Sequence, residues 1–208
     1  MKSKILIITG GTGGHVIPAL NFFNYIKNDS KNVFLLTDYR GYKYIKKNDK
    51  VNVLKIQSSH LSGNIYFKFL GIIKLLIGFF QSFMIFLKIR PKIIISFGSY
   101  ASLSPLICFL IFKFFFKTRL YIHEQNSIIG QTNKIFSKYS KKIFVNFDKK
   151  YQNLVNHKKN IYVVGLPQKN IHSIYVENKN DTNFNFLFNY FSYYFINCHK
   201  NSIKSSKN

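Results

Sequence analysis

Residues 10–15, Gly-Gly-Thr-Gly-Gly-His, are the part of the sequence whose composition points most directly to ligand chemistry. They lie between a short apolar run and a segment whose apolar residues recur at helical spacing. Glycines let backbone N–H groups approach a ligand closely, and the N-terminus of the following helix adds positive potential. We therefore expect a cradle for phosphate oxygens here, with a tight strand-to-helix turn that binds no ligand as the alternative.

Two familiar phosphate-binding loops do not fit this stretch. A dinucleotide-binding fingerprint counted from Gly11 and Gly13 requires a third glycine where Val16 stands. A nucleotide-binding P-loop requires Gly-Lys-Ser/Thr, and His15 and Val16 occupy those places instead. The stretch is therefore neither of these two loops.

Two further polar stretches follow predicted strands. Residues 123–126, His-Glu-Gln-Asn, come directly after a predicted strand that ends at Ile122, and residues 97–100, Phe-Gly-Ser-Tyr, form a small-residue turn after another. Ligands of open α/β sheets bind at the carboxyl ends of the strands. A lone histidine is more often structural, but His15 and His123 both fall at this edge. We therefore expect residues 10–15 and 123–126 to meet there around a ligand.

Short β-rich runs alternate with longer helical segments along the chain, which predicts βαβ units. Strands are expected at residues 5–9, 33–37, 51–56, 92–97, 120–122, 142–145 and 161–164. Helices are expected around residues 16–27, 65–89, 101–116 and 131–139. Pro18 is expected in the first turn of the first helix, where a missing N–H costs nothing. The predicted fold class is α/β, a Rossmann-like, doubly wound parallel sheet.

The composition bounds the domains and the partners. Residues 1–167 carry the alternating pattern, residues 168–183 are polar like a linker, and residues 184–208 are aromatic and aperiodic. The chain holds 31 Lys plus Arg against 7 Asp plus Glu, a formal charge of +24. This balance suggests an anionic partner, with residue choice driven by an AT-rich genome as the alternative. Cys108 and Cys198 lie far apart, so neither a disulfide framework nor a metal site is expected.

The stretch from Ile65 to Ile89 is strongly apolar and has to be weighed as a membrane helix. Lys74 interrupts it, and its longest uncharged run, residues 75–87, is shorter than the roughly 20 residues that span a bilayer. Bulky apolar side chains with lysines suit a helix that lies in the interface of an anionic membrane. We expect peripheral membrane contact, with a buried helix that covers the sheet as the alternative.

Residues 10–20, 97–100, 123–126 and 130–134 together resemble, in order and spacing, the N-terminal domain of the peptidoglycan N-acetylglucosaminyltransferases of glycosyltransferase family 28. The resemblance runs from about residue 4 to residue 169. It implies one half of a GT-B architecture, in which two Rossmann-like domains face a cleft and the N-terminal one takes the lipid-linked acceptor. It also implies work at the cytoplasmic face of the inner membrane, peripherally bound to anionic lipid, with no metal, no cofactor and no nucleic acid.

The activity implied by the resemblance is the inverting transfer of N-acetylglucosamine from UDP-N-acetylglucosamine to undecaprenyl-pyrophosphoryl-N-acetylmuramoyl-pentapeptide, which converts lipid I to lipid II. The resemblance places six residues at the substrate site or its edge: Thr12, Gly13, Gly14, Tyr100, Asn126 and Lys169. The family's Gly-Asn-Pro-x-Arg reads Gly-Leu-Pro-Gln-Lys at residues 165–169. Lys169 therefore puts a point charge where the family has a bidentate donor.

Inverting transfer needs a base that deprotonates the sugar hydroxyl of the acceptor, and positive potential for the departing diphosphate. His15 is the candidate base because a neutral imidazole can accept that proton, and Glu124 is the second candidate. A structural role for His15, in which it caps the loop, is the alternative.

A second domain of the family would open with a strand and a Gly-Gly-Ser-Gln-Gly-Ala phosphate loop, and no such glycines follow residue 184. We therefore expect a truncated or split transferase with little or no activity alone. Two other interpretations stay open. One is a non-catalytic membrane-associated module that binds the lipid precursor, and the other is a basic nucleic-acid binder, for which no reading motif is visible.

Overall fold

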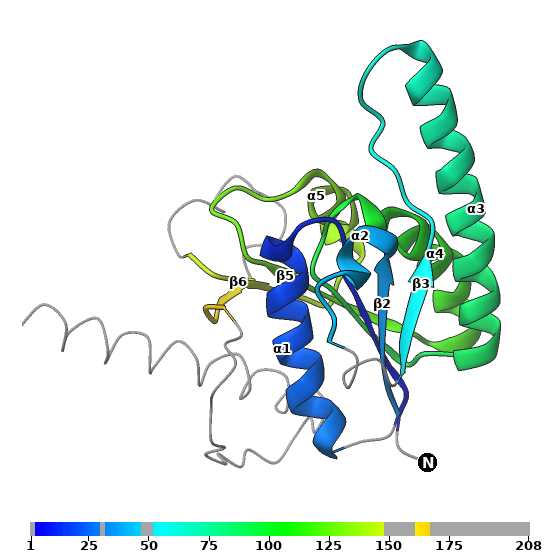
Figure 1. Cartoon of the computed structure of the whole chain (residues 1–208). Coiled ribbons are helices and arrows are strands. Elements are labelled where there is room, and N and C mark those ends of the chain that lie inside the picture. The colour runs from blue at the N-terminus through cyan, green and yellow to red at the C-terminus, as the bar shows by residue number, and fades with distance from the viewer. Residues whose placement is uncertain (1–2, 30–31, 47–51, 148–160, 167–208) are drawn as a thin grey trace, which may run out of the picture.

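Seven parallel strands form a single sheet in the computed structural model, which describes residues 3–29, 32–46, 52–147 and 161–166 (Figure 1). The strands are β1 (Ile5–Ile8), β2 (Val33–Asp38), β3 (Val53–Ile56), β4 (Ile93–Ser96), β5 (Arg119–Glu124), β6 (Lys142–Val145) and β7 (Ile161–Val163). They lie in the order β3-β2-β1-β4-β5-β6-β7. The order runs in opposite directions from the boundary between β1 and β4, so the prediction of a doubly wound parallel sheet is confirmed.

The helices connect these strands as βαβ crossovers. They are α1 (Gly13–Asp29), α2 (Tyr39–Tyr42), α3 (Ile65–Ile89), α4 (Leu103–Phe116) and α5 (Gln131–Phe136), with 3₁₀ turns at Tyr100–Ser102 and Ser137–Tyr139. Four of them were predicted from the sequence, α1 from the helical spacing of its apolar residues. The exception is α2, which is only 4 residues long and therefore too short to show a period.

The sheet is buried on both faces, as continuous apolar strands predict. Ile7 of β1 faces a cluster with Phe22 and Phe23 of α1, and its neighbours Leu6 and Ile8 face the opposite cluster. That second cluster contains buried residues of α3, α4 and α5. One layer of the domain is therefore α1, and the other is the layer of α3, α4 and α5 (Figure 1).

Helix α3 projects beyond the carboxyl edge of the sheet in Figure 1, and its later turns pack on the sheet and on α4. A Cβ added at Gly78 would lie 2.0 Å from the carbonyl oxygen of Gln57, so only glycine lets the segment after β3 run this close to the helix. Ser104 of α4 donates its hydroxyl to the carbonyl of Leu75 at 3.0 Å. These contacts fix α3 against the domain while its outer face stays uncovered.

Two local expectations are wrong. Pro18 lies inside α1, in its second turn, because the helix already begins at Gly13. A proline there has no N–H to donate to the carbonyl of Gly14. Strand β5 does not end at Ile122 but continues through Glu124, because His123 and Glu124 pair with Phe144 and Val145 of β6.

Candidate functional site

The glycine-rich loop, residues 10–15, joins β1 to α1 at the carboxyl edge of the sheet, beside the point where the strand order reverses. A Cβ added at Gly10 would lie 2.4 Å from Cβ of Ala101, so this glycine lets the loop press against the turn that follows β4. The carbonyl of Thr12 accepts from the N–H groups of His15 and Val16, both at 3.1 Å. Gly13 and Gly14 therefore occupy the first turn of α1, where backbone N–H groups have no partner within the helix.

Asp38 anchors this loop by accepting a hydrogen bond from its backbone, although Asp38 belongs to none of the sequence motifs. Its Oδ1 accepts from the N–H of Gly11 at 2.9 Å and from that of Gly41 at 2.8 Å. Its Oδ2 accepts from Ser58 Oγ at 2.9 Å and from Arg40 Nε at 3.0 Å. Burial raises the pKa of Asp38, but these four hydrogen bonds outweigh it, so the pKa lies below its ordinary value. In the sequence, Asp38 could be recognised as a functional residue only because it is one of few acidic residues and directly follows a predicted strand.

His15 lies where the loops after β1, β4 and β5 meet. Its Nδ1 is 2.8 Å from the carbonyl oxygen of Phe97, and Gln125 Nε2 donates to the same oxygen at 2.9 Å. Gln125 Nε2 also contacts His15 Nδ1 directly. A carbonyl oxygen can only accept, so in the tautomer that hydrogen-bonds to Phe97 Nδ1 carries the proton and Nε2 carries the lone pair. The prediction that residues 10–15 and 123–126 meet at one edge of the sheet is confirmed.

His123 does not face a ligand, contrary to expectation. It is fully buried at the end of β5, its ring packs on that of Phe97 with centroids 4.9 Å apart, and its Nε2 donates to the carbonyl of Gly165 at 3.0 Å. Burial lowers the pKa of His123 to about 4, so the ring is neutral at physiological pH. The histidine joins β5 to the segment that follows β7.

Glu124 is also fully buried, and its carboxylate is saturated by donors from the following loop and from α5. Oε1 accepts from the backbone N–H and from Nδ2 of Asn126, both at 3.0 Å. Oε2 accepts from the N–H of Gly130 and from Nδ2 of Asn133, both at 2.9 Å. Such a carboxylate fixes the shape of the loop after β5, because every lone-pair direction already has a partner.

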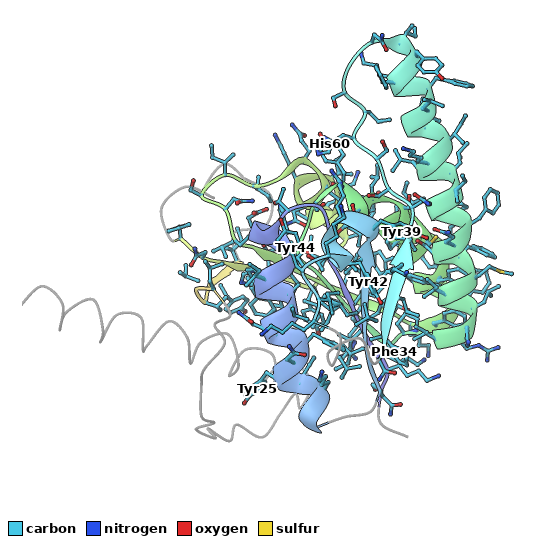
Figure 2. The ribbon with its side chains drawn as sticks, viewed as in Figure 1. Tyr25, Phe34, Tyr39, Tyr42, Tyr44 and His60 are labelled. Carbon is cyan, nitrogen blue, oxygen red and sulfur yellow. The ribbon has the colours of Figure 1, made fainter. Side chains whose placement is uncertain are left out.

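The remaining expected site residues divide into four groups. Thr12 and Gly14 are exposed at the start of α1. A Cβ added at Gly13 would lie 3.1 Å from the ring of Tyr44, which Figure 2 shows beside the start of α1. Asn126 is exposed, whereas Gln125 beside it is buried. Tyr100 is half-buried, and its ring centroid lies 3.9 Å from that of His60, on the loop between β3 and α3. Lys169 lies outside the described residues.

Three groups therefore lie close together at this edge of the sheet: the N-terminus of α1, the Nε2 atom of His15, and the guanidinium of Arg40. Arg40 is 47% exposed, and its Nη2 would lie 3.8 Å from a Cβ on Gly11. Among the described residues no group of three His, Cys, Asp or Glu side chains is placed to hold a metal ion. The chemistry available to these residues is therefore anion binding together with proton transfer.

Residues 5–145 match the glycosyltransferase family 28 N-terminal domain. Proteins called UDP-N-acetylglucosamine–N-acetylmuramyl-(pentapeptide) pyrophosphoryl-undecaprenol N-acetylglucosamine transferase are similar to this chain. The one from Rickettsia canadensis is 35% identical over 173 residues, and the one from Rickettsia rickettsii is 33% identical over 175 residues. These matches cover 82% and 83% of this chain but 46% and 44% of the relatives. The chain thus spans about half the length of the curated relatives it matches.

Solved structures share the fold. Acinetobacter baumannii MurG superimposes with a TM-score of 0.64 at 21% identity, over 80% of this chain and 46% of that one. A UDP-N-acetylglucosamine 2-epimerase from Rickettsia bellii superimposes with a TM-score of 0.55 at 12% identity, over 79% of this chain and 45% of that one. At these identities the likeness concerns the fold alone, and it confirms the predicted Rossmann-like domain of the GT-B type.

Proposed function

The chain belongs to glycosyltransferase family 28, and from that premise we propose that it serves the transfer of N-acetylglucosamine from UDP-N-acetylglucosamine to undecaprenyl-pyrophosphoryl-N-acetylmuramoyl-pentapeptide. The names of the Rickettsia relatives support this donor and this acceptor. The observation that carries the proposal is the meeting of three strand-end loops around His15 at the carboxyl edge of the sheet. The step is the conversion of lipid I to lipid II in peptidoglycan synthesis.

The reaction we propose is a single displacement with inversion. His15 Nε2 takes the proton of the acceptor's sugar hydroxyl as the hydroxyl oxygen attacks the anomeric carbon of N-acetylglucosamine. The bond from that carbon to the diphosphate of UDP breaks, and UDP leaves with the electron pair. The product is the new glycosidic bond and a protonated imidazole, which returns its proton to water.

His15 is a better base than Glu124 on geometric grounds. The hydrogen bond from Nδ1 to Phe97 orients the His15 ring and leaves Nε2 able to accept a proton. Glu124 already accepts four hydrogen bonds and is fully buried. We therefore assign Glu124 the task of shaping the loop that carries Asn126.

The substrate groups that we place at this edge are anionic. The N–H groups of Thr12, Gly13 and Gly14 at the start of α1 suit a diphosphate, because the helix dipole and the unpaired donors act together. Asn126 and Tyr100 lie on the two neighbouring strand-end loops, where they would contact the sugars. In the family pattern Lys169 stands where a contact to the donor is made, and it lies outside the described residues.

Peripheral membrane contact through α3 completes the proposal, at the cytoplasmic face of the inner membrane. By length and composition α3 could cross a membrane, and only 22% of its most apolar window is buried. However, Phe86 and Ile89 near its end lie in the core of the domain, so a spanning α3 would have to leave that core. An interfacial helix keeps these contacts and covers Phe80 and Met84, each 66% exposed.

The test is a transfer assay with UDP-N-acetylglucosamine and a lipid I analogue, run on the chain alone and on the chain mixed with the remaining half of a Rickettsia relative. His15→Asn is the decisive variant, because its amide Nδ2 can still donate to Phe97 while no lone-pair nitrogen remains at the Nε2 position. His15→Gln is the matched control for side-chain volume. Turnover that His15→Asn abolishes supports the base; turnover that His15→Asn leaves intact refutes it.

The second candidate function is a non-catalytic module that binds the lipid precursor at the membrane. The exposed apolar face of α3, with Phe80 and Met84 each 66% exposed, favours this function, because it needs no catalytic group. Binding of the lipid I analogue by the chain, with no turnover in any mixture, would establish this function in place of the first.

A further inference from the structure

Arg40, on the short helix α2, lies beside the glycine-rich loop. A Cβ added at Gly11 would lie 3.8 Å from Arg40 Nη2, and one added at Gly41 would lie 3.1 Å from Cα of Gly10. Helix α2 therefore packs directly against the loop, and Figure 1 shows it near the start of α1. This packing brings the guanidinium of Arg40 within reach of an anion held at the first turn of α1.

Asp38 fixes the guanidinium in this position. Arg40 Nε donates to Asp38 Oδ2 at 3.0 Å, and the side chain of Asp38 is 3% exposed whereas that of Arg40 is 47% exposed. The bond uses one N–H group of the guanidinium, and those on Nη1 and Nη2 have no partner within the described part of the chain. A guanidinium that is already oriented loses less conformational entropy when it binds a ligand.

Asp38 does not cancel the charge of Arg40. Its carboxylate also accepts from the N–H groups of Gly11 and Gly41 and from Ser58 Oγ, at 2.9, 2.8 and 2.9 Å. The negative charge is thus shared among four donors, so Arg40 is not its only counter-charge. Arg40 and the N-terminus of α1 are therefore two separate sources of positive potential at this edge of the sheet.

The two sources lie close together on the loop. Gly11 lies beside Arg40, and Gly13 begins α1. Two residues of chain span at most about 7 Å, so a ligand with two linked phosphates can place one phosphate at each source. A monophosphate has less negative charge and only one set of oxygens to share between them. The arrangement therefore favours a diphosphate.

We propose that Arg40 binds the second phosphate of a diphosphate whose first phosphate lies at the N-terminus of α1, and that Asp38 positions Arg40 for this contact. Arg40 is thus the residue that selects a diphosphate over a monophosphate. This inference rests on the proposed function and deepens it, because it assigns a side chain to the diphosphate of that reaction. The diphosphate belongs either to a nucleotide or to a prenyl lipid, and the test distinguishes the two.

The first test measures binding of two ligand pairs to the full chain: UDP with UMP, and geranyl diphosphate with geranyl monophosphate. Arg40→Gln removes the charge while Asp38 keeps three donors, and Arg119→Gln at the amino end of β5 is the matched control. Arg40→Gln should weaken binding of the diphosphate by about 10–100-fold, because hydrogen bonds between charged groups are the strong ones. Binding of the monophosphate by Arg40→Gln, and of every ligand by Arg119→Gln, should stay within about twofold.

The pair that shows the selective loss identifies the source. A loss for UDP assigns Arg40 to the nucleotide, a loss for geranyl diphosphate assigns it to the prenyl lipid, and either result supports the inference. Three results would overturn it: a parent chain that binds neither diphosphate, equal losses for the diphosphate and the monophosphate, or equal losses in Arg40→Gln and Arg119→Gln.

The outcome for the proposed function is separate. Selective binding of a diphosphate through Arg40, without glycosyl transfer in the assay above, would refute the proposed function and leave this inference standing. Transfer that Arg40→Gln leaves intact would refute this inference and leave the proposed function standing.

The positioning role of Asp38 is tested by the ratio of diphosphate to monophosphate affinity. Asp38→Asn should lower this ratio about fivefold, because an unfixed guanidinium loses more entropy on binding. In the Arg40→Gln background the same change should leave the ratio unaltered, because no guanidinium remains to be positioned. A purely structural role would lower both affinities alike, so a constant ratio in both backgrounds would refute the positioning role.

A further test uses the unaltered chain, whose three arginines are Arg40, Arg90 and Arg119. All three are exposed, so phenylglyoxal should modify each of them, and mass spectrometry of the peptides measures each rate. A diphosphate at ten times its Kd should slow modification of Arg40 about tenfold and leave Arg90 and Arg119 unchanged. Equal modification of Arg40 with and without the diphosphate contradicts the inference even if the variants misfold.

Discussion

The carboxyl edge of the sheet buries charged side chains, whereas the outer face of α3 and α4 exposes apolar ones. At the carboxyl edge the two buried carboxylates are saturated: Asp38 and Glu124 each accept four hydrogen bonds from the protein. On the outer face, Phe80 and Phe114 are mostly exposed and lysines have no described carboxylate beside them. In the first region the carboxylates are paired within the described residues, and the second is the surface that we propose to contact the membrane.

This difference teaches where stability and binding reside. A substitution of a carboxylate at the carboxyl edge leaves buried donors without acceptors. It therefore lowers the free energy of unfolding and alters the geometry around His15. A change on the outer face removes surface that folding never buried, so it should alter association with a membrane and little else. The following predictions, from the largest effect to the smallest, test this separation.

Removal of the proposed base should have the largest effect. His15→Asn should lower transfer by about 10²–10⁴-fold, because general base catalysis contributes that much. Affinity for phosphatidylglycerol vesicles should not change, since His15 lies at the carboxyl edge. Transfer rates and vesicle co-sedimentation on one preparation measure both. Parallel losses in the two assays would show that the regions are coupled.

Removal of the Glu124 carboxylate should destabilise the fold. Glu124→Ala leaves donors of Gly130 and Asn133 buried without an acceptor, which costs about 3–5 kcal/mol in the free energy of unfolding. Phe80→Ala on the outer face is the control and should change that free energy by less than about 0.5 kcal/mol. Urea titrations of the two variants against the parent chain measure the difference, and similar midpoints for both would break the comparison.

Folding stability should depend on pH through His123. Burial lowers its pKa to about 4, against about 6.5 in an unfolded chain. Between these values the unfolded chain binds a proton that the folded chain does not. The stability is therefore complete above pH 6.5 and falls by about 3 kcal/mol as the pH drops to 4.

Urea unfolding at several pH values measures this dependence. His123→Gln, which can still donate to Gly165, should flatten the slope between pH 4 and 6.5, and the exposed His60→Gln should keep it. A slope that survives His123→Gln would mean that other groups carry the acid sensitivity of the fold.

A polar substitution on the outer face should have the smallest effect on folding stability, and it should lower the affinity for vesicles selectively. Phe80→Ser removes an apolar side chain that is 66% exposed, so affinity for vesicles should fall about tenfold while the urea midpoint stays within error. The same substitution at Phe86, which is fully buried, should unfold the domain and serves as the contrast. Unchanged vesicle binding by Phe80→Ser would place the membrane contact elsewhere.

Much of the fold follows from local pattern. Apolar runs such as residues 33–37 and 142–145 are fully visible in the sequence, and parallel topology then brings every strand-end loop to one edge. The meeting of the glycine-rich loop with the turn after β4 and with residues 123–126 was predictable for that reason. The short helix α2 and the role of Asp38 were not, because four residues show no period and a carboxylate does not reveal its donors.

The sequence by itself determined the alternation of strands and helices, the placement of residues 10–15 after a buried strand, and the apolar character of α3. Only the tertiary structure decided which polar groups form hydrogen bonds within the protein. Gln125 reaches His15 across 110 residues, and His15 reaches Phe97 across 82. Periodicity is a property of neighbours along the chain, whereas the choice of a hydrogen-bond partner depends on packing between distant segments. For that reason His123 and Glu124, expected at a ligand, instead lie in the interior.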